Sequence, residues 1–236
     1  MIYVCCSFPV AFILEGQLQR VRQLSALKPF CDADDTITMI ASRRARMSRV
    51  LGPVLTAPGV VVHELAHRLA CSLVGVRVAE VAYFRLGDPA GYVRHEDPAT
   101  YRAAFVISVA PFFVNTALSL ALFAACWGLV STVVPLEPSV GTLEALLTGE
   151  PELLAGAGVL AWLATGVGLH AFPSTGDASN LWQRTRRDWT GAPLVLLGLP
   201  FVFLIYVINL LSWAYAHLFY ALGLGLGAFV LVSTIV

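Results

Sequence analysis

The C-terminal part of the chain, residues 193–236, is one apolar run without a single Lys, Arg, Asp or Glu. A helix needs about 20 residues to cross a hydrocarbon core about 30 Å thick, so this run is too long for one membrane span. We therefore divide it near residues 212–217 into two spans. The whole chain has 58% hydrophobic and 13% charged residues, which a water-soluble fold of this size cannot bury. The sequence predicts a membrane protein.

Three further apolar segments are long enough to cross a bilayer, at about residues 51–76, 101–134 and 153–172. The predicted fold is an all-α multi-spanning membrane protein with about five transmembrane helices. We expect residues 47–190 to form a three-helix core and residues 191–236 to add two C-terminal helices.

A short β-hairpin is expected between the first two spans. Val78, Val81 and Tyr83 favour a strand, the Gly87-Asp88-Pro89 stretch is typical of a turn, and residues 91–93 fit a returning strand. Open strand edges are not tolerated in lipid, so this hairpin must pack against protein or face water.

The N-terminal residues 1–46 do not follow this pattern. Residues 2–14 are apolar but short for a span, and they lack the basic start of a secretory signal. Residues 15–46 are polar without clear periodicity. We expect either a disordered tail or a stretch upstream of a true start at Met47, with an amphipathic membrane anchor as the alternative.

The charges of the loops predict an orientation. Residues 77–100 and 178–192 are rich in Arg, whereas residues 135–152 contain four Glu and no Lys or Arg. The positive-inside rule places the two basic loops in the cytoplasm and the acidic loop outside. The prediction is a multi-pass protein of the cell membrane.

The net charge of zero gives no indication of a nucleic-acid partner, and the oligomeric state is open.

The first apolar segment contains the motif His63-Glu64-Leu65-Ala66-His67. Two histidines four residues apart lie on one face of a helix, where both can bind one Zn²⁺ ion. Glu64 is then the expected general base. Ionisable groups inside a membrane segment are costly and are usually functional.

A catalytic zinc site needs a third protein ligand, for which Asp177 is the first candidate. It follows Pro173 and Gly176, which can interrupt a helix and turn the carboxylate inward. The competing interpretation makes Asp177 the N-cap of a helix over residues 178–188. His170 is the alternative third ligand, but we assign it a supporting catalytic role as a hydrogen-bond donor to the substrate carbonyl.

Two other histidines are not assigned to the metal. His95 fits a solvated turn next to Asp97-Pro98, and His217 fits an interfacial position near the break between the last two spans. Asn115 lies inside the second apolar span, where it can contact either a substrate backbone or a neighbouring helix.

These residues together resemble the site-2 protease family of intramembrane zinc metalloproteases. The resemblance rests on the His63-Glu64-x-x-His67 motif in a membrane segment and on Asp177 after a proline in a later one, and it covers roughly residues 51–190. It implies a three-helix catalytic core, zinc held by His63, His67 and Asp177, and Glu64 as the catalytic glutamate. His170, Gly176 and Ala178 depart from the usual pattern around the aspartate, which is typical of a divergent member.

The expected function is hydrolysis of peptide bonds in membrane protein or peptide substrates within the lipid bilayer, close to its cytoplasmic face. Water would reach the metal along the polar residues 87–97 and the interrupted helix near residues 173–176. Three alternatives stay open: a zinc hydrolase of a lipid or small molecule, a protein that binds or transports metal, and a regulator that keeps the fold without catalysis.

Overall fold

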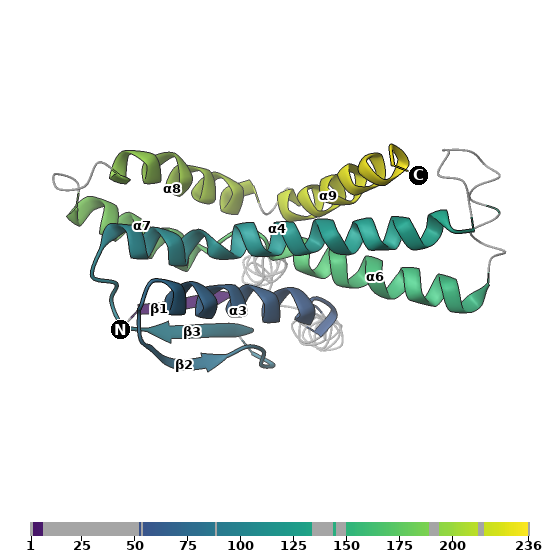
Figure 1. Cartoon of the computed structure of the whole chain (residues 1–236). Helices are drawn as coiled ribbons and strands as arrows, with labels where there is room; N and C mark the ends of the chain where they lie inside the picture. Colours follow the sequence, from purple (N-terminus) through teal and green to yellow (C-terminus); the bar gives the residue numbers. More distant parts are fainter. Residues whose placement is uncertain are drawn as a thin grey trace, which may run out of the picture.

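The computed structural model describes residues 2–6, 52, 54–87, 89–133, 144, 150–188, 194–211 and 215–235 (Figure 1). These residues form helices and three short strands. In chain order the elements are β1 (Ile2–Cys6), α3 (Ala57–Leu73), β2 (Val78–Ala82), β3 (Gly91–His95), α4 (Tyr101–Ser131), α6 (Pro151–Leu169), α7 (Thr175–Arg187), α8 (Leu194–Leu210) and α9 (Ala216–Ser233).

Helices α3, α4 and α6 pack against one another and form the centre of the fold (Figure 1). Small residues allow this close packing. A Cβ atom on Gly59 of α3 would overlap the carbonyl oxygen of Gly166 on α6, so only glycine fits there. Small residues bring helix backbones together in the same way in membrane proteins generally. The predicted three-helix core therefore has a physical basis in the packing of α3 on α6.

The β-sheet covers one side of α3 (Figure 1). Strands β2 and β3 form the predicted hairpin, and β1 pairs antiparallel with the other edge of β3, giving the order β1-β3-β2. Gly91, Val93 and His95 alternate as buried residues along β3. The first part of the predicted tail thus belongs to the sheet as a strand, whereas residues 7–50, including the proposed start at Met47, lie outside the described residues.

Three helices in the described part of the chain are long and apolar enough to cross a membrane: α4, α6 and α9. The protein is therefore a membrane protein, and the described residues show three of the five predicted spans. Helices α3 and α8 have 17 residues each, about 25 Å at 1.5 Å per residue. In α3 the polar residues His63, Glu64, His67 and Arg68 also lower the hydropathy.

The long C-terminal apolar run divides into α8 and α9, as predicted. Tyr215 precedes α9 and has a left-handed backbone conformation (φ 60°), which no residue adopts inside a continuous helix. Helix α8 packs on α7 and α4, whereas α9 packs on α4 and α6. The two helices therefore cover different parts of the core (Figure 1).

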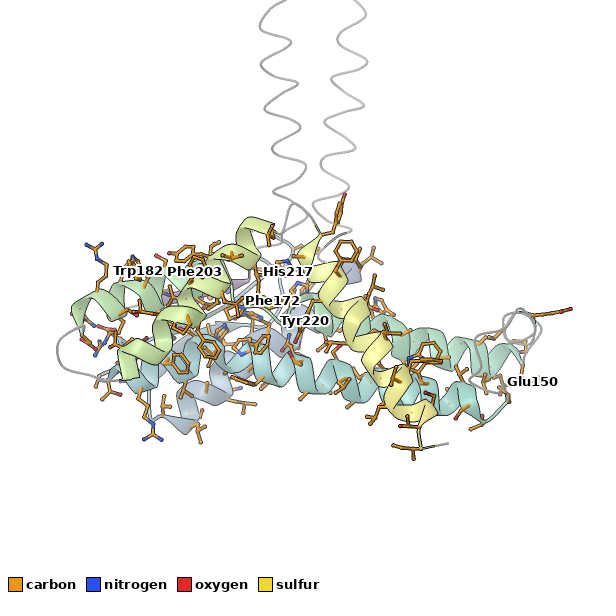
Figure 2. All side chains as sticks on the ribbon, turned by 90° about the horizontal axis from the view of Figure 1, so that it is seen from above. Glu150, Phe172, Trp182, Phe203, His217 and Tyr220 are labelled. Carbon is orange, nitrogen blue, oxygen red and sulfur yellow. The ribbon has the colours of Figure 1, made fainter. Side chains whose placement is uncertain are left out.

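The basic loop after the hairpin contacts the basic helix α7. The Nη2 atom of Arg184 donates to the carbonyl of Ala99 at 2.7 Å, and the Nη2 atom of Arg187 donates to Oδ2 of Asp97 at 3.2 Å. Glu150, at the end of the acidic loop, lies at the opposite end of the molecule from Trp182 of α7 (Figure 2). The arrangement agrees with the predicted separation of the basic and acidic loops; which side is cytoplasmic stays a prediction.

Candidate metal centre

Helix α3 brings three ionisable side chains into the interior. His63, Glu64 and His67 expose 1%, 0% and 0% of their surface, although Leu65 and Leu69 of the same helix are exposed. The buried face of α3 thus carries three ionisable groups among small and apolar residues, whereas leucines of the same helix are exposed. Exposed leucines fit a helix whose outer face meets lipid.

Both histidines are oriented by backbone carbonyls of neighbouring elements. The Nδ1 atom of His63 lies 2.8 Å from the carbonyl oxygen of His170, and that of His67 lies 2.9 Å from the carbonyl oxygen of Ile107. A carbonyl can only accept, so each Nδ1 carries the hydrogen. Each Nε2 therefore has a free lone pair, which is the arrangement of metal-binding histidines.

The two Nε2 atoms face each other at 3.1 Å. When both rings are neutral and donate through Nδ1, neither Nε2 has a hydrogen to offer the other, and the two lone pairs repel each other. A bound cation, or a proton on one ring, removes this repulsion. In their neutral form the two rings therefore have the donor set of a metal centre.

The carboxylate of Asp177 adds a third acceptor next to the two Nε2 atoms. Its Oδ2 atom lies 3.6 Å from Nε2 of His67 and 4.0 Å from Nε2 of His63, and one ligand atom from each residue falls within 4.8 Å of the others. Two ligands at 2.0–2.1 Å from a tetrahedral zinc ion lie about 3.3 Å apart. The observed spacings are close to this value, so the three residues fit Zn²⁺.

Asp177 is not the N-cap of α7, which corrects the competing interpretation. Helix α7 begins at Thr175, Ser174 is its N-cap, and Asp177 closes a capping box by accepting from the backbone N–H and the hydroxyl of Ser174, both at 2.8 Å. These bonds use Oδ2. The Oδ1 atom is buried and has no hydrogen-bond partner among the described residues. The oxygen nearest the two histidines is therefore also the one that closes the capping box, so a capping role and a ligand role meet in one carboxylate.

Asp177 is ionised in this setting. Burial raises the pKa of its carboxyl, but the imidazoles of His67 and His63 and the hydrogen bond from Ser174 outweigh burial and hold the pKa below its usual value. A metal ion bound through both Nε2 atoms would displace any proton from them, so the ligand set would then be two neutral imidazoles and one carboxylate.

Glu64 lies beside the three ligands but does not belong to their cluster. The start of β3 packs against it: a Cβ atom on Gly91 would lie 2.7 Å from Cγ of Glu64 and 2.9 Å from Cγ1 of Val60. The absence of a side chain at Gly91 thus leaves room for the Glu64 carboxylate. The hairpin limits the positions that this side chain can take.

His170 contributes its backbone to the site. Its carbonyl orients His63, whereas its Nδ1 atom is 3.0 Å from the carbonyl oxygen of Gly166. Asp177, and not the His170 imidazole, joins the two histidines as a ligand. The predicted role of His170 as a donor to a substrate carbonyl stays a prediction.

Asn115 of α4 holds the backbone around the site. Its Nδ2 atom donates to the carbonyls of His170 at 2.9 Å, Val167 at 3.3 Å and Gly59 at 3.5 Å. The side chain is fully buried. The interhelical hydrogen bond, one of the two roles considered for Asn115, is therefore the one in this structure. The signal in the sequence is a single amide in an apolar span.

His95 is not part of a solvated turn, contrary to expectation. It is the last residue of β3 and exposes 2% of its surface, because the alternation along β3 turns it toward the helices. His217 is also buried, with its ring 5.5 Å from that of Phe172, near Tyr220 (Figure 2). The adjacent Asp97-Pro98 turn suggested exposure for His95, whereas the interfacial position of His217 stays a prediction.

Comparison of the chain with protein-family models, with curated proteins and with solved structures finds no match.

Proposed function

We propose that this protein is an intramembrane zinc metalloprotease, as its resemblance to the site-2 proteases implies. One observation carries the proposal: Nε2 of His63, Nε2 of His67 and Oδ2 of Asp177 converge in the interior, next to the buried Glu64. Zinc, when bound, supplies a Lewis acid that activates water and polarises the scissile carbonyl.

Glu64 acts as general base in this proposal. Its carboxylate takes a proton from the attacking water and later passes it to the departing amide nitrogen. Its position one residue after His63, on the buried face of α3, supports this role. Gly91 supports it as well, because a side chain there would displace Glu64 from its present position.

The membrane setting supports a substrate within the bilayer. Helices α4 and α6, which flank the site, are long and apolar enough to span a membrane, and the outward face of α3 carries exposed leucines. A membrane segment must unwind locally before hydrolysis, since the amides of a helix are bonded within the helix.

The proposal is tested with the purified chain in lipid nanodiscs and a library of membrane-spanning peptides. The wild type should cleave at least one peptide. Glu64→Gln should keep its zinc and lose about 10²–10⁴-fold in rate, as expected when a general base is removed. Wild-type rates in Glu64→Gln would refute the proposed chemistry. Zinc flux into vesicles without any hydrolysis would favour transport instead.

A further inference from the structure

A cavity of about 370 Å³, lined by several polar residues, lies between the end of β3, the first half of α4 and helix α7. In a chain with 58% hydrophobic residues, its lining is unusual. The polar residues in the wall include His95, Asp97, Ser108, Asn180, Gln183 and Arg184. The volume falls in the range of ligand sites, which is about 300–1,000 Å³.

The cavity shares its wall with the metal centre. Ile107 lines the cavity, and its carbonyl is the group that orients His67. Asn180 lies one helical turn after Asp177 on α7. A molecule in this cavity therefore lies next to Ile107, whose carbonyl orients the proposed ligand His67.

His95 provides an acceptor in the cavity wall. Its Nδ1 atom lies 2.7 Å from the carbonyl of Glu96 and so carries the hydrogen, which leaves a lone pair on Nε2. That atom is buried and has no hydrogen-bond partner among the described residues. Burial also lowers the pKa of the imidazole, which keeps the ring neutral. A buried acceptor without a partner is unfavourable, so a group that donates to it gains binding energy.

The charges around the cavity balance one another. Arg184 lies 2.7 Å from Asp188 and 3.6 Å from Asp97, and Arg187 lies 3.2 Å from Asp97. Because both guanidinium groups already have carboxylate partners, the cavity offers little to a free anion. An uncharged group with an N–H or O–H suits it better.

We propose that this cavity binds an uncharged polar residue of the substrate, such as Ser, Thr or Asn, next to the scissile bond, with His95 accepting its hydrogen bond. The proposal rests on the proposed protease function. It specifies the substrate class: membrane segments that are cut where an apolar stretch meets a polar residue, on the side of the basic loops.

The test uses the full chain in nanodiscs with the peptide that the wild type cuts best. Mass spectrometry locates the bond, and each flanking residue is then changed to Ser, Asp or Leu. The wild type should prefer Ser over Leu about tenfold on one side of the bond, the effect of one hydrogen bond. His95→Leu should remove this preference, whereas His95→Gln should retain it through its amide oxygen. His217→Leu is the control, because it alters another buried histidine away from the cavity.

A binding measurement separates this inference from the proposed function. The Glu64→Gln protein is titrated with apolar membrane peptides that carry Ser or Leu at successive positions. A Ser preference in affinity that disappears in His95→Leu supports the cavity site even if the wild type cleaves nothing. Equal affinities for Ser and Leu, or a preference that survives in His95→Leu, would overturn it. Stronger binding of Asp than of Ser would do so too, since it would identify an anion site.

Discussion

The Nε2 atoms of His63 and His67 lie 3.1 Å apart, while each ring gives its Nδ1 hydrogen to a backbone carbonyl. The two carbonyls come from elements distant in the chain: His170 follows α6, and Ile107 lies in α4. The packing of three helices therefore fixes the two ligands. Several consequences of this arrangement can be measured.

Asn115→Leu should weaken zinc binding. The Nδ2 atom of Asn115 and Nδ1 of His63 donate to the same carbonyl, so loss of the amide leaves that carbonyl free to move. Loss of such an outer hydrogen bond typically costs about 10–100-fold in metal affinity. Competition with a zinc-binding dye measures the change.

Ser119→Ala is the matched control for Asn115. Ser119 lies one turn further along α4, and its hydroxyl donates to the carbonyl of Ala164 at 2.8 Å and not to a carbonyl that orients a ligand. Its removal should leave zinc affinity unchanged. If both variants weaken zinc binding equally, the effect comes from helix packing and not from the position of His63.

Gly91→Ala should lower the rate of hydrolysis while zinc stays bound. The new Cβ would lie 2.7 Å from Cγ of Glu64, which forces the carboxylate away from its position. Gly87→Ala in the same hairpin region is the control, since a Cβ there has open space. Zinc content and turnover are measured on the same samples. Full activity in Gly91→Ala would argue against the proposed placement of Glu64.

Gly59→Ala should destabilise the core. A Cβ at this position would overlap the Gly166 carbonyl and lie 2.6 Å from Nδ1 of His170, so α3 and α6 must move apart. Overpacking of this kind costs about 1–3 kcal/mol. A thermal melt in detergent should show the loss, and Gly158→Ala, which has open space in α6, should not. Equal melting temperatures would contradict the close contact of the two helices.

The elements of the core could be predicted because local signals determine them. Apolar runs gave α4 and α6, alternation and turn residues gave the hairpin, and the His63-to-His67 spacing gave one helix face. The limits of α3 were wrong by several residues: Pro58 near the first turn lets the helix begin at Ala57. Its polar residues also shorten the part that resembles a membrane span.

The parts that escaped prediction depend on contacts between distant segments. Strand β1 was not predicted, because it forms by pairing with β3, which lies far along the chain. His95 is buried only because β3 turns it toward the helices. Asp177 was considered as an N-cap or as a ligand, whereas it lies at the third position of α7, closes the capping box of Ser174 and also approaches His67.

Zinc content of the purified protein tests the central claim most directly. The wild type, prepared without chelators, should bind about one zinc ion per chain. Asp177→Ala should lose it, because a third ligand is removed. His170→Ala should keep it, because only the carbonyl of His170 orients a ligand. Full zinc content in Asp177→Ala would contradict the ligand assignment, and a wild type without zinc would contradict the metal centre itself.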